Sequence, residues 1–169
     1  AISAQDITSG LVLHYSCDQL SGTDLVDNSG NNNDGTLQGN AVVAEGFEGQ
    51  GVRCLIKADY IAAPDHLNAG LSSFTFSAWV KLNALKNGTR FFDWGSGADG
   101  TGNFIAFVPS YDGDNGYMNL RFRPASGTAS DVFSDTRCPV GEWAHVAVTY
   151  AWNGSSGSAT IYLNGKATG

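Results

Sequence analysis

The sequence predicts an all-β fold, an antiparallel β-sandwich. In the segment 143–150, successive side chains fall alternately on two faces, the period of an extended strand and not of a helix. A second β-rich run, Ala159–Leu163, ends at Asn164-Gly165, a dipeptide that favours the two-residue turn of a hairpin. Short β-rich segments recur about every 8–12 residues, a spacing typical of sandwiches, and no helix of ordinary length is expected.

Along the chain, residues 1–9 are expected to be a lead-in and residues 10–169 to form one domain. The first strand is expected at Gly10–Tyr15. The polar segment Asp18–Asp34 contains turn formers and no strand pattern. A short turn or a single helical turn is expected between Asn68 and Ser73. The other expected strands are 41–43, 52–56, 60–63, 74–81, 90–94, 103–109, 116–123, 129–134, 143–150 and 159–163.

Sequence blocks in a fixed order identify a family. The blocks are Leu11–Asp18, Asp27–Leu37 (DNSGNNNDGTL), Gly46–Val52 (GFEGQGV) and Phe74–Lys81 (FTFSAWVK), followed by the late strands described above. In this order they resemble the laminin-G-like jelly-roll domains of the concanavalin A-like lectin/glucanase group. Such domains normally continue after the Asn-Gly turn, so we expect the closing strands to lie outside this chain, on a second chain or a downstream segment that covers the sheet edge.

Charge and composition exclude several classes of partner. The net charge is −7 with only 9 Lys and Arg, too few to neutralise the phosphates of a nucleic acid or an anionic membrane. No apolar run is long enough to span a bilayer. An acidic surface is compatible with a neutral glycan or with Ca²⁺.

The three cysteines, Cys17, Cys54 and Cys138, lie far apart and form no zinc or redox motif. Two arrangements are open: a Cys17–Cys54 disulfide with one free thiol, or three buried reduced thiols.

The polar loop 18–34 is the candidate metal site. Calcium takes six to eight oxygen ligands from carboxylates, amides and carbonyls, and this loop concentrates such groups. The resemblance implies a structural calcium near this end of the domain, and the residues that it assigns are Asp18, Asp27, Asn31 and Asp34. The alternative is that these side chains cap turns through hydrogen bonds to the backbone. A second acidic cluster, 112–116, is interpreted as a hairpin turn at Asn115-Gly116.

Catalytic patterns are missing from the sequence. A retaining glucanase needs paired carboxylates on one face of a strand, and the only glutamates, Glu45, Glu48 and Glu142, lie beside glycines in turns or at a strand entrance. No G-x-S-x-G elbow is present. The chain is therefore expected not to be an enzyme.

Aromatic residues beside loops are the candidate ligand site. Sugar rings stack on Trp and Tyr, while charged and amide side chains form hydrogen bonds with the sugar hydroxyls. Trp79 and Trp143 lie in the signature strands and are expected in the core. The expected glycan or peptide site comprises Trp94, Tyr111, Arg121 and Trp152. Alternatively, these residues only shield the ends of the sandwich.

The resemblance implies a secreted or cell-surface recognition module that binds carbohydrate and is accessory to a larger carbohydrate-active or surface protein. A domain without a ligand that docks a catalytic neighbour is the second possibility. The third is a polysaccharide lyase or glycoside hydrolase with an atypical site, supported only by Tyr117, Arg121 and Arg123.

Overall fold

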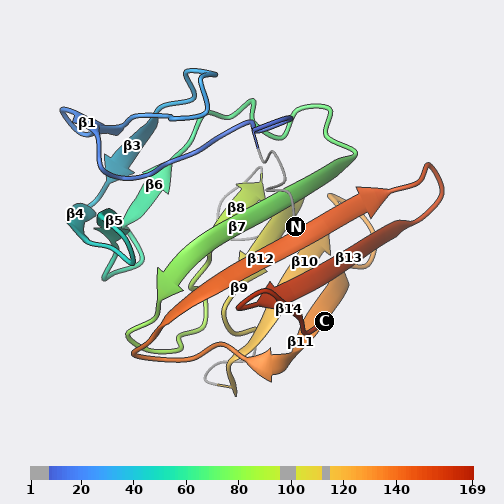
Figure 1. Ribbon diagram of the computed structural model, residues 1–169. Coiled ribbons are helices and arrows are strands. Elements are labelled where there is room, and N and C mark those ends of the chain that lie inside the picture. Colours follow the sequence, from blue (N-terminus) through green and yellow to red (C-terminus); the bar gives the residue numbers. More distant parts are fainter. Residues whose placement is uncertain (1–7, 96–101, 112–114) are drawn as a thin grey trace, which may run out of the picture. The chain divides into compact units, whose positions relative to one another are not determined.

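The computed structural model describes residues 8–95, 102–111 and 115–169, and it divides the chain into two compact units, residues 1–69 and 70–169. The elements described in both units are strands, numbered β1 to β14 and labelled in Figure 1 where there is room, and the strand pairs are antiparallel. The predicted all-β fold is confirmed. Within the described ranges, no helix is long and apolar enough to cross a membrane.

The first unit contains a small sheet and a separate hairpin. The sheet has the order β1-β2-β3-β6, and β4 pairs only with β5. The strands are β1 (Leu20–Ser21), β2 (Asp24–Leu25), β3 (Gly35–Gln38), β4 (Val42–Glu45), β5 (Gln50–Arg53) and β6 (Tyr60–Ala62).

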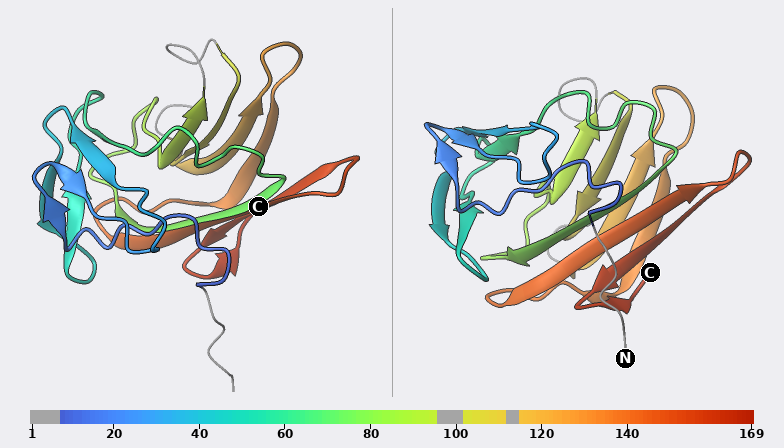
Figure 2. Two further views of the ribbon diagram at one scale, coloured as in Figure 1. Left: turned by 90° about the horizontal axis from the view of Figure 1, so that it is seen from above. Right: turned by 45° about the horizontal axis from the view of Figure 1, so that its top comes forward.

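The second unit is a sandwich of two four-stranded sheets. One sheet has the order β14-β13-β12-β7 and the other β11-β10-β9-β8, and they lie face to face as two layers (Figure 2). The strands of the first are β7 (Ser73–Lys81), β12 (Trp143–Trp152), β13 (Gly157–Leu163) and β14 (Lys166–Ala167). Those of the second are β8 (Phe92–Gly95), β9 (Phe104–Val108), β10 (Tyr117–Arg123) and β11 (Ser130–Arg137).

The core of this unit lies between the two sheets. Alternation places every second side chain of a strand on the inner face, and these positions carry large apolar residues. Fully buried core residues come from both layers: Phe107, Met118, Leu120, Val146, Val148 and Ile161. The remaining positions of the same strands form the outer faces, so alternation also determines which residues are available to a ligand.

The hairpin prediction at Asn164-Gly165 is confirmed. Asn164 and Gly165 both have positive φ, 50° and 77°, as a type I′ turn requires, and they join β13 to β14. The side chain of Asn164 also accepts a hydrogen bond from the backbone N–H of His145 at 2.9 Å, which ties the turn to β12.

The expected first strand at Gly10–Tyr15 is wrong. This segment is irregular because its backbone is held by side chains of the following polar loop and not by a neighbouring strand. The carbonyl of Val12 accepts from the side chains of Asn33 and Ser29, and the N–H of His14 donates to Asp27. The polar loop itself contains the two short strands β1 and β2, which were not expected.

Two further expectations need correction. Trp79 and Trp143 are not in the core. Trp79 lies on the outer face of β7, 46% exposed, with its ring centre 5.4 Å from that of His145, and the half-buried Trp143 lies on the same face of β12 as His145. The three cysteines are free thiols, and they match neither expected arrangement: Cys54 is exposed, Cys17 half-buried and Cys138 buried.

Candidate functional site

The candidate site is a groove of about 280 Å³ on the outer face of the sheet β11-β10-β9-β8. Its position follows from register: Ala106 and Phe104 of β9 lie opposite Arg121 and Arg123 of β10, and none of these four faces the core. The residues that give the groove its chemistry are Arg90, Phe104, Tyr111, Asn119, Arg121 and Arg123.

Arg121 is held at the centre of the groove by two neighbours. Its guanidinium donates a hydrogen bond to the hydroxyl of Tyr111, and its Cζ lies 4.9 Å from the centre of the Tyr111 ring. On the other side it forms an ion pair of 3.5 Å with Asp131, the residue directly opposite on β11. The Tyr111 ring is in turn packed edge-on against Phe133, with ring centres 5.7 Å apart.

A second pair of arginines shares one aromatic ring. The Cζ atoms of Arg90 and Arg123 lie 5.4 Å and 6.0 Å from the centre of the Phe104 ring. Arg90 also forms a hydrogen-bonded ion pair with Asp93. Cation–π contacts of this kind hold a guanidinium in place while leaving donors at its edge for a ligand.

Asn119 lies at the base of the groove, in register with Val108 and Phe133. It is fully buried, and its Nδ2 donates to the carbonyl of Val132 at 3.2 Å. Its Oδ1 is buried and has no hydrogen-bond partner among the residues that the structure describes. A buried acceptor without a donor lowers the stability of a fold by about 1–3 kcal/mol. A ligand that brings a donor into the groove would remove this cost.

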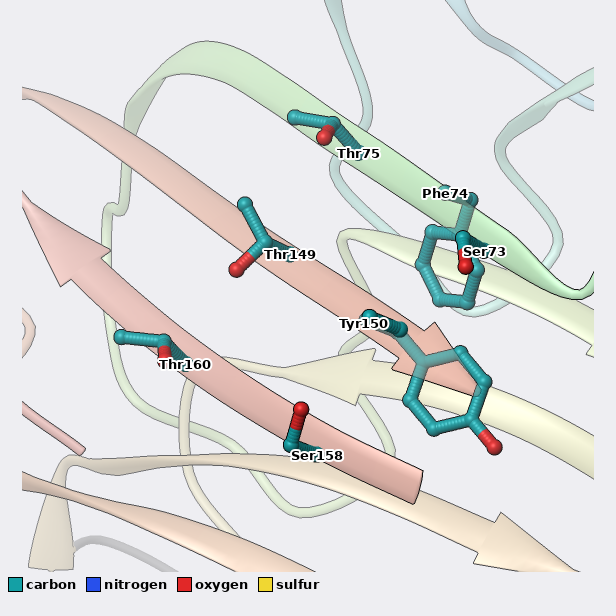
Figure 3. A pocket seen from close by; sticks show the side chains of 8 residues that line it. Ser73, Phe74, Thr75, Thr149, Tyr150, Ser158 and Thr160 are labelled. Carbon is teal, nitrogen blue, oxygen red and sulfur yellow. The ribbon is translucent and has the colours of Figure 1, made fainter. Parts of the chain in front are cut away.

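A second, shallower hollow of about 320 Å³ lies on the other sheet. Figure 3 shows its polar residues on three neighbouring strands. Thr75, Thr149 and Thr160 lie side by side in register on β7, β12 and β13. The lining of this hollow contains hydroxyl groups and no charged residue.

The structure brings together only two of the four predicted ligand residues, Tyr111 and Arg121. Trp94 points to the inner side of β8, where its ring centre lies 4.9 Å from that of Phe74 and 4.7 Å from that of Phe92. Trp152 is 45% exposed at the end of β12, in the other sheet.

Sequence reasoning missed Arg90, Phe104 and Asn119. A usable signal existed on β10, because Asn119, Arg121 and Arg123 are polar at every second position of a strand whose other residues are apolar. Tyr117 precedes them, but its ring lies beneath Arg137, with a Cζ-to-centre distance of 5.2 Å. The residues 112 and 114 of the second acidic cluster lie outside the described ranges.

The proposed calcium ligands cap turns in the first unit. The two oxygens of Asp27 accept hydrogen bonds from the N–H groups of His14, Ser29 and Asn33, each at 2.9 Å, and from the Ser29 hydroxyl at 2.7 Å. Burial opposes ionisation of Asp27, but the Ser29 hydroxyl and these N–H groups outweigh burial and lower its pKa to about 2.

Asp18, Asn31 and Asp34 do not surround a common point together with Asp27, as the ligands of one ion would. Asp34 accepts from the N–H of Asp27 at 2.8 Å, while Asn31 donates to the carbonyl of Leu11 at 2.8 Å. Asp18 accepts from the N–H of Gln50, at the β4–β5 hairpin. Among the residues with described positions, no group of three or more acidic, His or Cys side chains is placed to hold a metal. The arrangement does not fit a calcium ion held by these four residues.

The buried Asn33 of the same loop is the centre of a polar network. The Nε2 of His66 lies 2.9 Å from the Oδ1 of Asn33, whose own amide donates to Val12. The hydroxyl of Tyr15 donates to the carbonyl of Asn33 at 2.8 Å. Burial, followed by the charges of Asp27 and Asp34, raises the pKa of Tyr15 to about 12, so this donor keeps its proton.

Comparison with known proteins now assigns the fold to a family. The model of the concanavalin A-like lectin/glucanases superfamily named Laminin_G_3 matches residues 56–169. The chain belongs to this family, as the sequence blocks indicated. No curated protein sequence matches the chain.

Three solved structures share the fold. Domain 4 of AbnA, a GH43 extracellular arabinanase from Geobacillus stearothermophilus solved with arabinotriose, is 29% identical, with a TM-score of 0.71 over 94% of this chain and 73% of that one. An S-layer domain-containing protein from Clostridium thermocellum is 23% identical, with a TM-score of 0.62 over 93% and 70%. The binding domain of Paraclostridial Mosquitocidal Protein 1 is 19% identical, with a TM-score of 0.66 over 96% of this chain but 40% of that one.

Proposed function

We propose that this chain is a carbohydrate-binding module that holds a sugar non-covalently in the groove on the outer face of the β8–β11 sheet. The observation that carries the proposal is the buried Oδ1 of Asn119, an acceptor without a partner at the base of that groove. A sugar hydroxyl supplies the missing donor.

The rest of the groove suits the same class of ligand. Carbohydrate sites combine aromatic surface with a few fixed polar groups. Here Tyr111 and Phe104 provide the aromatic surface, and Arg121 provides N–H donors from a fixed position. Because these groups are already ordered by contacts with one another, less conformational entropy is lost when a sugar binds.

The likeness to domain 4 of AbnA supports an accessory role. That domain belongs to an extracellular arabinanase and was solved with arabinotriose. By analogy, this chain is proposed to serve outside the cell as the sugar-binding part of a larger carbohydrate-active protein. Among the carboxylates with described positions, Asp93 and Asp131 lie beside the groove, and each is paired with an arginine, which favours binding over acid–base catalysis.

The test is isothermal titration calorimetry with arabinotriose and with xylo-, cello-, galacto- and galacturono-trimers, on the wild type and on Asn119→Leu. Leu has a similar volume and no acceptor, so we expect the variant to bind the preferred trimer at least about tenfold more weakly. Its melting temperature is expected to change little, because removal of the unpaired Oδ1 offsets the loss of the hydrogen bond from Nδ2 to the Val132 carbonyl.

Thr149→Val is the matched control, since it removes a hydroxyl from the hollow of the other sheet. We expect it to bind like the wild type. Loss of binding in Thr149→Val, with Asn119→Leu unaffected, would move the site to the other sheet. Absence of binding to every trimer would overturn the carbohydrate function.

A further inference from the structure

We infer that the groove takes an acidic sugar, a residue that carries a carboxylate such as a hexuronate, in preference to a neutral one. This inference rests on the proposed carbohydrate function and specifies its ligand. It is carried by the grouping of arginines: three of the chain's 9 basic residues, Arg90, Arg121 and Arg123, line one groove of a protein whose net charge is −7.

The three guanidiniums are gathered by the strands themselves. Arg121 and Arg123 are two positions apart on β10, on the same face, so their Cα atoms are about 6.6 Å apart. Arg90 reaches the same Phe104 ring as Arg123 although it precedes β8 in the chain. The aromatic rings and the ion pairs fix these side chains before any ligand arrives, which lowers the entropic cost of binding.

The guanidiniums of Arg90 and Arg121 have more donors than the contacts described above engage. A guanidinium carries five N–H groups. The contacts of Arg121 to Tyr111 and Asp131, and that of Arg90 to Asp93, each engage one Nη1 atom. The groove therefore offers many fixed donors, whereas the oxygen of Asn119 is an acceptor that lacks a donor.

A carboxylated sugar offers an acceptor to the guanidinium donors and a donor to the Asn119 oxygen. Its carboxylate accepts paired hydrogen bonds from a planar guanidinium, a charge-assisted contact roughly twice as strong as a neutral one. Its ring hydroxyls donate to the Asn119 oxygen. A neutral sugar satisfies Asn119 equally well but makes only neutral-acceptor contacts with the arginines.

The neighbouring charges favour a single acidic group over a dense polyanion. Asp93 and Asp131 offset part of the positive charge of the groove, and the acidic protein around it repels further anions. The hollow on the other sheet has no charged lining residue, so an acidic ligand has no comparable site there.

The test compares trigalacturonate with its fully methyl-esterified form, which has the same shape without the charge, and with arabinotriose. Calorimetry is expected to give at least about tenfold tighter binding for the acid than for the ester. The affinity for the acid is expected to fall as NaCl is raised from about 50 to 500 mM, since salt screens charge pairs in a partly exposed groove.

Three variants test whether the arginines of the groove cause the preference for the acid over the ester. Arg123→Gln and Arg121→Lys are each expected to weaken binding of the acid about tenfold and binding of the ester by a clearly smaller factor, because only the acid loses a charge-assisted contact. Lys81→Gln removes the same charge from the exposed outer face of the other sheet and is expected to bind like the wild type. Thermal melts of each variant check that the fold is intact, and the acid–ester comparison needs no variant.

Each outcome separates the two proposals. Equal or tighter binding of the ester or of arabinotriose, still lost in Asn119→Leu, overturns the acidic ligand and leaves the carbohydrate function standing. Tighter binding of a sulfated galactose trimer than of trigalacturonate overturns the assignment to a carboxylate. Binding of none of these sugars removes both proposals.

Discussion

Asp27 and Ser29 are joined by two hydrogen bonds, one to each oxygen of the Asp27 carboxylate. The backbone N–H of Ser29 donates to one oxygen at 2.9 Å, and its hydroxyl donates to the other at 2.7 Å. With the further N–H groups of His14 and Asn33, a single side chain organises the turn and anchors the segment that precedes it.

This relationship predicts that the first unit is sensitive to acid. The pKa of Asp27 is lowered to about 2 in the folded protein, so its ionised form stabilises the fold at any pH above the unfolded value of about 4. That contribution is lost as the pH falls from about 4 towards 2. Asp27→Asn is expected to lower the free energy of unfolding near pH 7 by about 2 kcal/mol, with a smaller difference from the wild type at pH 2.

Urea denaturation at pH 7, 4 and 2 measures this difference. Asp65→Asn, at an exposed position in the turn 65–70, removes the same charge and is expected to change stability by less than about 0.5 kcal/mol. A deficit for Asp27→Asn that is as large at pH 2 as at pH 7 would contradict the assigned role of the ionised carboxylate.

Calcium is expected to leave the melting temperature unchanged. Both oxygens of Asp27 already accept hydrogen bonds, so a calcium ion would have to break the turn that it was expected to stabilise. Thermal melts in EDTA and in about 1 mM CaCl₂ test this, because a ligand of the native state raises the melting temperature. A calcium-dependent rise that disappears in Asp34→Ala would restore the metal site.

The three thiols are expected to react in a fixed order with a thiol reagent such as DTNB. Burial raises the pKa of the Cys138 thiol to about 11, and Cys138 is 3% exposed, so it should react only after unfolding. Cys54 is exposed and should react first. Titration in denaturant without a reductant is expected to count three thiols; a count of one would indicate a disulfide.

Much of the fold was predictable because its signals are local. The alternation of Trp143–Tyr150 and the Asn164-Gly165 turn depend only on neighbouring residues, and both predictions match the structure. The strand expected at Gly10–Tyr15 was wrong because its backbone bonds mainly to side chains of residues 27–33, and at His14 also to the backbone of Asn28, which no periodicity reveals. The prediction that Trp79 lies in the core was wrong because its place in a family sequence block does not tell which face of the strand is inward.

The site was harder to predict because it depends on register between strands. Tyr111 and Arg121 meet only through the pairing of β9 with β10, and Arg90 joins them from before β8. Trp94 was misplaced because β8 has four residues, too few for alternation to distinguish the inner face from the outer one.

The position of β7 in its sheet also affects how fast the second unit folds. β7 pairs with β12 along its whole length, yet the entire opposite sheet, β8 to β11, lies between them in the chain. The hairpins β9–β10, β10–β11 and β12–β13 close short loops, and such hairpins form in microseconds. Joining β7 to β12 requires the closure of a much longer loop, so this non-local step is expected to set the folding rate.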